Sequence, residues 1–136
     1  MLTVLEVQYI AHRLAKDVME WDEPIPAFET RFPHKLESCL LTPFQTWKKR
    51  HLYQGIYKKA SILFYLLIKN HPFSNGNKRI AVTSLLVFLH KNGKWIDVDN
   101  RELYQFAVWV AESNPKVKAH AVAAIHAFLQ SYIVEL

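Results

Sequence analysis

Cysteine, glycine and long hydrophobic runs are all scarce in this sequence of 136 residues. The single cysteine, Cys39, excludes an internal disulfide bond and a cysteine-based zinc site, and it is typical of a protein in a reducing cytoplasm. Three glycines are too few for a collagen-like or glycine-rich low-complexity chain. The most apolar stretches, 62–68 and 80–89, are too short to cross a bilayer. The first residues lack the basic start of a signal peptide, so we expect a cytoplasmic protein without membrane contact.

The composition is that of a soluble globular core, since 51% of the residues are hydrophobic and 21% are charged. The length suits one domain, and we expect a single domain to span residues 1–136. Seventeen lysines and arginines against twelve acidic residues give a formal charge of +5. This excess is compatible with an acidic or phosphorylated partner, although many proteins carry a charge of this size.

Apolar residues recur at helical spacing along almost the whole chain, which predicts an all-α fold, a compact bundle of five or six helices. Thr3 and Glu6 form a capping-box pattern at the start of the first helix. The helix at 77–91 is apolar nearly all round and is expected to be the most buried. Asn100 and Asn114 are expected to cap the last two helices. The expected helices are 3–20, 34–41, 54–70, 77–91, 101–113 and 115–135.

Two segments interrupt the helical pattern. Residues 42–52 show no helical period and predict an exposed loop or small hairpin, and residues 95–98 predict a short strand. A basic run beside a tryptophan, 47–51, could indicate nucleic-acid binding. A solvated loop is the commoner origin of such a run, so nucleic acid is not an expected partner. Six further histidines show no metal-ligand spacing and are expected to be structural: His12, His34, His51, His90, His120 and His126.

The chemically informative segment is 71–79, which reads His-Pro-Phe-Ser-Asn-Gly-Asn-Lys-Arg. It lies at the start of the most buried expected helix, where unpaired backbone N–H groups and the helix dipole favour an anion. Gly76 would let the backbone approach a ligand closely, while Arg79 offers phosphate oxygens a planar fork and Lys78 a point charge. His71 is placed to take a proton from an attacking hydroxyl. The alternative is that Lys78 and Arg79 are solvated first-turn residues and His71 an ordinary loop histidine.

These nine residues resemble the signature of the Fic/Doc family, H-P-F-x-[D/E]-G-N-[G/K]-R, and meet eight of its nine positions. The flanking features agree: a helix ends before His71, an apolar helix follows Arg79, and Asn92-Gly93 ends that helix. The resemblance covers nearly the whole chain, whose length is similar to that of the short Doc (death-on-curing toxin) branch. It implies a Fic/Doc-type helical bundle with a small flap, His71 as the catalytic base, and a nucleotide-binding role for Gly76, Asn77, Lys78 and Arg79.

The residue before the final arginine separates two activities in the family. Members with glycine there transfer AMP from ATP to a target hydroxyl, whereas the Doc branch has lysine, which resembles Lys78 here. In that branch the lysine occupies α-phosphate space and the γ-phosphate of ATP faces the histidine. The resemblance therefore implies a protein kinase acting on Ser or Thr, for which elongation factor Tu is the family's known target. AMP transfer is the alternative within the enzyme class.

One position departs from the family signature. Asn75 stands where the family usually has Asp or Glu, the ligand of Mg²⁺. An amide oxygen can coordinate Mg²⁺, but it lacks the charge of a carboxylate, so we expect the ion to bind mainly through the nucleotide phosphates. Outside the enzyme class, the alternative is a catalytically weak binding module that keeps the fold and the anion pocket. Asn75 favours that alternative, whereas His71 and Arg79 oppose it.

The resemblance also implies partners. In the family, a flap holds the target segment by adding it as a strand, and the candidate flap here consists of Thr42, Pro43, Phe44, Gln45 and Thr46. Ser131 and Glu135 match part of the inhibitory helix that some members carry, and we interpret this match as chance. Without a built-in inhibitor, the resemblance implies a toxin controlled by a separate antitoxin whose C-terminal tail folds as a helix on it.

Overall fold

The N-terminal segment forms one continuous helical stretch. The computed structural model describes residues 1–136, and in it α1 (Val4–Glu6), the π-helical η1 (Val7–Ala11) and α2 (His12–Asp17) follow one another without a break. The predicted capping box is present, because Thr3 and Glu6 each accept a hydrogen bond from the other's backbone N–H. The stretch ends at Asp17, earlier than predicted, since Val18 is extended and Met19 has a positive φ of 56°.

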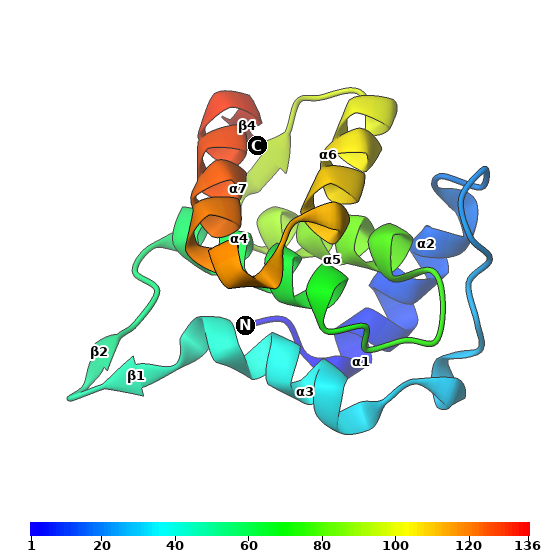
Figure 1. Ribbon diagram of the computed structural model, residues 1–136, viewed down its shortest axis with the longest axis horizontal. Helices are drawn as coiled ribbons and strands as arrows, with labels where there is room; N and C mark the ends of the chain where they lie inside the picture. The colour runs from blue at the N-terminus through cyan, green and yellow to red at the C-terminus, as the bar shows by residue number, and fades with distance from the viewer.

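The segment before the central helices ends in a projecting hairpin. A short turn, η2 (Phe28–Thr30), leads to α3 (Pro33–Leu41) and to the 3₁₀ turn η3 (Thr42–Phe44). Strands β1 (Thr46–Trp47) and β2 (Arg50–His51) then pair antiparallel, so the predicted loop or hairpin at 42–52 is a hairpin preceded by a helical turn. Figure 1 shows this hairpin extending away from the body of the molecule.

Two central helices, α4 (Ile56–Lys69) and α5 (Asn77–Lys91), form the middle of the core. α4 packs against α5 and also against α6 (Asn100–Glu112) and α7 (Lys118–Tyr132). In Figure 1, α6 and α7 lie on one side of the central pair, while α1 and α3 lie on the other. The prediction that the 77–91 helix is deeply buried is confirmed, since its fully buried side chains include Ile80, Leu85 and Leu89.

The C-terminal end departs from the prediction. A 3₁₀ turn, η4 (Pro115–Val117), precedes α7, which ends at Tyr132 rather than near 135. The last residues form β4 (Ile133–Glu135), which pairs antiparallel with β3 (Lys94–Ile96). The β-branched Ile133 and Val134 favour a strand once β3 offers them a partner, and helical periodicity cannot register such a partner. Glu135 lies in this strand and pairs with Lys94, so Ser131 and Glu135 do not share a helix.

The caps of the last helices are partly as predicted. Asn114 accepts a hydrogen bond from the backbone N–H of Lys116, as expected of a cap. At α6 the capping residue is Asp99 instead of Asn100, and it accepts from the N–H of Arg101 at 2.7 Å. The predicted all-α class is confirmed, because the chain is mostly helical and its strands form two small two-stranded sheets. None of the helices has the length and apolar character needed to span a membrane.

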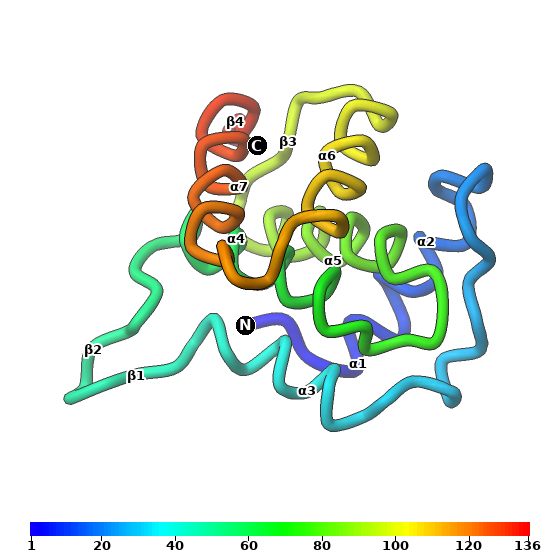
Figure 2. The backbone as a smooth tube through the Cα atoms, viewed as in Figure 1, coloured from blue at the N-terminus to red at the C-terminus, as the bar shows by residue number.

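The length of α4 separates the hairpin from the loop that carries the signature. The hairpin precedes α4 and the loop at 70–76 follows it. Fourteen helical residues at 1.5 Å each give a separation of about 21 Å along the axis. In Figure 2 the hairpin and this loop lie at opposite ends of the molecule, and the loop lies beside the N-terminal helices.

Candidate active site

The loop at 70–76 is fixed to the core by its two apolar residues. Phe73 is 1% exposed, and its ring centroid lies 6.0 Å from that of His12 and 5.9 Å from that of Phe28. The carbonyl of Pro72 accepts a hydrogen bond of 2.8 Å from the N–H of Phe32. Pro72 and Phe73 therefore tie the loop to the core.

His71 is held outward by this loop. Its side chain is exposed and makes no hydrogen bond within the protein, so both ring nitrogens are accessible to a substrate. Its backbone has a φ of 48°, in the left-handed region that costs a residue other than glycine roughly 1–2 kcal/mol. Such strain persists where the surroundings impose it, and it is concentrated at functional sites. Here the anchored Pro72 and Phe73 impose it.

α5 begins without a side-chain cap. Its N-cap residue is Gly76, with a φ of 70°, and the first intrahelical hydrogen bond runs from the N–H of Ile80 to the Gly76 carbonyl. The N–H groups of Asn77, Lys78 and Arg79 consequently have no acceptor within the helix. Three unpaired donors at the positive end of a helix of 15 residues form a site for an anion.

The Asn77 side chain closes the loop. Its Oδ1 accepts a hydrogen bond of 3.0 Å from the N–H of Phe73, and its Nδ2 donates to the carbonyl of the same residue at 2.8 Å. This pair of bonds fixes the loop geometry that presents His71. Asn77 was predicted to bind a nucleotide, and in this arrangement its backbone N–H is the group that remains available for phosphate.

Lys78 is paired with a carboxylate from a distant part of the chain. Its Nζ lies 3.1 Å from Oε1 of Glu23, and both side chains are partly exposed. An exposed pair of this kind contributes between zero and about 1 kcal/mol. A phosphate group with more negative charge can therefore compete with Glu23 for this ammonium.

Arg79 requires a correction. Its side chain was predicted to bind phosphate oxygens, but it is 4% exposed and its guanidinium donates to backbone carbonyls. The acceptors lie at and just beyond the end of α2, with distances of 2.6 Å to Ala15, 2.9 Å to Val18 and 2.8 Å to Glu23. The arginine satisfies the Ala15 carbonyl, which the end of α2 leaves unpaired, and places its charge at the negative end of the helix dipole. In this structure Arg79 thus positions the N-terminal segment, and only its backbone N–H faces the anion site.

Gly76 is required by a contact within the protein. A Cβ built at this position would lie 2.8 Å from Cδ1 of Ile25 and 3.0 Å from the carbonyl oxygen of Pro24. The glycine was predicted to permit the close approach of a ligand. The close approach seen here is instead that of Pro24 and Ile25, which cover this side of the helix start.

The residues present do not form a magnesium site by themselves. No group of three or more His, Cys, Asp or Glu side chains lies together anywhere in the protein. Asn75 is half-buried and can offer one amide oxygen. Mg²⁺ prefers six oxygen ligands and is commonly held by one or two carboxylates together with substrate phosphates. The protein side of the site therefore supplies at most one weak ligand.

The predicted flap, residues 42–46, does not lie beside the loop at 70–76 that carries His71. Thr42 and Pro43 belong to η3, Pro43 is buried, and the Phe44 ring packs 6.2 Å from that of Phe88. Gln45 and Thr46 alone belong to the hairpin, where the carbonyl of Gln45 accepts from the N–H of Leu52 at 2.9 Å. The protruding element is therefore 45–52 instead of 42–46, and α4 separates it from His71.

The sequence analysis missed the segment that covers the start of α5. We call residues 18–25 the strap, because its carbonyls hold Arg79, its Glu23 holds Lys78 and its Ile25 covers Gly76. The contact between Glu23 and Lys78 joins residues 55 positions apart, and no local pattern reports such a contact.

A comparison with models of known families matches residues 1–89 to the Fic/DOC family. The match spans more than half of the chain and includes the loop, the strap and most of α5. The chain therefore belongs to the Fic/DOC family, whose members modify proteins with the use of a nucleotide. Neither the curated proteins nor the solved structures contain a match to the chain.

Proposed function

We propose that the protein is a Doc-type toxin that transfers the γ-phosphoryl group of ATP to a Ser or Thr hydroxyl of a target protein. The observation that carries the proposal is the exposed His71, held on a strained backbone beside the uncapped start of α5. A proton acceptor next to an anion site is what phosphoryl transfer requires.

In the proposed step, the target hydroxyl oxygen attacks the γ-phosphorus and the bond from this phosphorus to the bridging oxygen of ADP breaks. A ring nitrogen of neutral His71 takes the hydroxyl proton, and ADP leaves with the electron pair of the broken bond. The N–H groups of Asn77, Lys78 and Arg79 donate to phosphate oxygens and stabilise the charge. Any Mg²⁺ would arrive with the nucleotide, with Asn75 as its only ligand from the loop.

The choice of γ-phosphoryl transfer over AMP transfer rests on Lys78. The Doc branch has lysine at this position, and the Lys78 ammonium lies in the first turn of α5, where it can reach a phosphate once Glu23 is displaced. With the lysine on the α-phosphate, the γ-phosphate faces His71. AMP transfer is the second candidate, and it requires the opposite orientation of the nucleotide.

The proposed partners follow from the same assignment. Elongation factor Tu is the first target to test, and inhibition of translation in the cytoplasm would be the result. We propose control by an antitoxin that folds a C-terminal helix onto the toxin. Nucleic acid is not part of the proposal.

The test is mass spectrometry of elongation factor Tu after incubation with the protein, ATP and Mg²⁺, with whole lysate as a second substrate source. We expect a phosphate-sized gain that disappears in His71→Asn, because asparagine tolerates left-handed φ but cannot act as the base. His34→Asn, an exposed histidine on α3, is the matched control and should retain activity. An increase in mass by the size of a nucleotide would indicate AMP transfer instead of kinase activity. Unchanged phosphate transfer by the His71→Asn variant would show that His71 is not the catalytic base. No modification of either substrate source would favour the weak binding module.

A further inference from the structure

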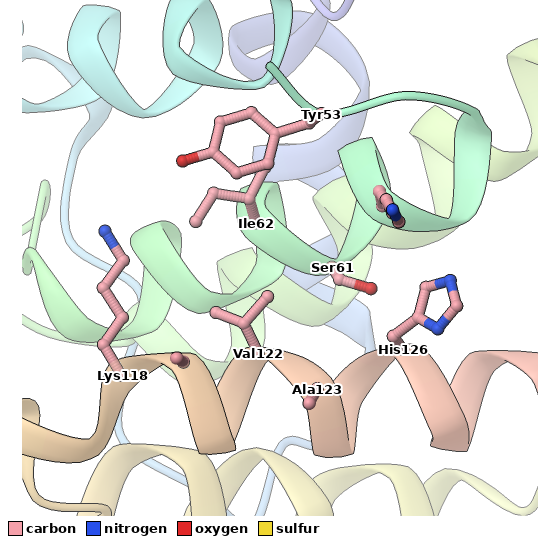
Figure 3. A pocket seen from close by; sticks show the side chains of 9 residues that line it. Tyr53, Ser61, Ile62, Lys118, Val122, Ala123 and His126 are labelled. Atoms are coloured by element: carbon pink, nitrogen blue, oxygen red, sulfur yellow. The ribbon is translucent and has the colours of Figure 1, made fainter.

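A cavity of about 630 Å³ lies between the first half of α4 and α7, remote from the loop that carries His71. This volume is within the usual range of small-molecule sites, about 300–1,000 Å³. The middle of the cavity is apolar and is formed by Ile62 of α4 and by Ala119, Val122 and Ala123 of α7. In Figure 3, Val122 points from α7 toward α4, and the side chain of Ile62 lies beside the ring of Tyr53.

Polar groups occupy the two ends of this α4–α7 cavity. In Figure 3, the ammonium of Lys118 and the hydroxyl of Tyr53 both point toward one end, and His126 lies at the other end. The eight helical steps from Lys118 to His126 correspond to about 12 Å along α7. The cavity therefore suits an elongated ligand with an apolar body and a polar group at one end.

The charges around the cavity are all of one sign. α4 and α7 contain no aspartate or glutamate, and the lining includes Lys58 and Lys118. Neither lysine makes an ion pair, because the three ion pairs of the protein involve Lys78, Lys91 and Lys94. Positive charge beside low-dielectric walls raises the local concentration of anions. This positive potential favours an anionic ligand and gives no electrostatic stabilisation to a neutral or cationic one.

The cavity is separate from the proposed active site. It uses α4 only from Lys58 to Ile62, whereas His71 lies beyond the C-terminal end of that helix. The seven helical steps from Ile62 to Lys69 correspond to about 10 Å along the axis of α4, and His71 lies two residues beyond the end of this helix. α7 also lies outside residues 1–89, the part matched to the family.

We propose that the α4–α7 cavity binds a small amphiphilic anion, a carboxylate with an unbranched apolar body. The carboxylate accepts hydrogen bonds from the Lys118 ammonium and the Tyr53 hydroxyl, and the chain lies along Ile62, Val122 and Ala123 toward His126. Lys58 adds to the positive potential without a fixed contact. This proposal does not depend on the proposed kinase activity.

Sodium octanoate is the first probe, with binding measured by isothermal titration calorimetry and localised by the amide NMR shifts of α4 and α7. About ten non-hydrogen atoms at typical ligand efficiency give a dissociation constant of a few millimolar or tighter, on the order of 10⁻³ to 10⁻² M. Lengthening the chain to decanoate should tighten binding about fourfold per added CH₂ until the cavity is filled. Octan-1-ol and octyltrimethylammonium have the same chain without the negative charge and should bind more weakly.

Substitutions locate the site. Ala123 is an exposed residue of α7 that lines the cavity, so Ala123→Phe should fill the cavity and weaken octanoate binding at least tenfold. The control is Ala127→Phe, one helical turn further along and outside the lining, which should leave octanoate binding unchanged. Lys118→Gln should weaken binding about threefold, as expected for a partly exposed ion pair, and the control Lys116→Gln should not. The proposal is overturned if octanoate shows no saturable binding, if the octyltrimethylammonium cation binds as tightly, or if Ala123→Phe has no effect.

Discussion

Among the three glycines, Gly76 is the one at which the surrounding structure leaves no room for a Cβ atom. Its φ of 70° and the 3.0 Å approach of the Pro24 carbonyl oxygen both exclude a Cβ. Gly76→Ala should lower the free energy of unfolding by about 2–3 kcal/mol, because backbone strain and a clash add. Gly93→Ala is the matched control, with a φ of 73° and no atom near its Cβ position, and it should cost only about 1 kcal/mol. Urea unfolding measures both, and equal losses would mean that the contact with Pro24 and Ile25 is unimportant.

Glu23 competes with any anion for Lys78. Glu23→Gln removes the negative charge and should strengthen ATP binding about threefold, since an exposed pair of this kind contributes less than about 1 kcal/mol. Calorimetric titration with ATP measures the change. Glu20→Gln alters an exposed carboxylate of the same strap that makes no ion pair, so it should have a smaller effect. Identical affinities in the two variants would show that the ion pair does not restrict the site.

His12 couples the stability of the fold to pH. Burial lowers the pKa of His12 below 6.5, against the opposing effect of its hydrogen bond to the Pro26 carbonyl at 2.9 Å. As the pH falls below 6.5, the unfolded chain takes up a proton before the folded one does, so stability must decrease. We expect the free energy of unfolding to fall between about pH 7 and pH 5. His12→Gln, which keeps a donor for Pro26, should flatten this decrease in urea titrations, whereas the exposed His34→Gln should not.

At the scale of elements, the hairpin has a strained turn. Lys48 and Lys49 have φ angles of 50° and 66°, and two-residue turns of this kind favour Asn-Gly. Replacing the two lysines by Asn-Gly should therefore stabilise the hairpin and slow hydrogen exchange at the Leu52 amide about fivefold. Replacement by Gln-Gln removes the same charges but keeps the strain, and it should not slow exchange. Faster exchange in the Asn-Gly variant would contradict this view of the turn.

The element boundaries show what local patterns can predict. The start of the N-terminal helix was predicted correctly because Thr3 caps a backbone group only three residues away. Asn114 also caps a nearby backbone group, but this group belongs to the 3₁₀ turn η4, and the last helix, α7, begins at Lys118 instead of at 115. The end of α7 was placed too late because residues 133–135 pair with β3, about forty positions earlier in the chain. Cap residues act locally, whereas strand pairing depends on a distant partner.

At the scale of the whole molecule, Cys39 reports global unfolding. It is fully buried, and burial raises the pKa of its thiol to about 11, so the reactive thiolate is scarce and inaccessible in the folded protein. We expect a thiol reagent to label Cys39 at the rate of global opening, and urea should accelerate labelling in step with unfolding. Rapid labelling in the absence of urea would indicate that α3 opens locally.

The sequence by itself determined the helical class, the position of the signature segment at 71–79 and the burial of α5, because helical periodicity, caps and the signature are all properties of neighbouring residues. Which partner each side chain of the site contacts was decided by the tertiary structure. Arg79 donates to the carbonyls of Val18 and Glu23 in the strap, which lie 61 and 56 positions earlier in the chain, so these contacts could not be inferred from its neighbours. The separation of the hairpin from His71 and the α4–α7 cavity likewise depend on how helices pack, and packing is set by contacts that sequence spacing does not encode.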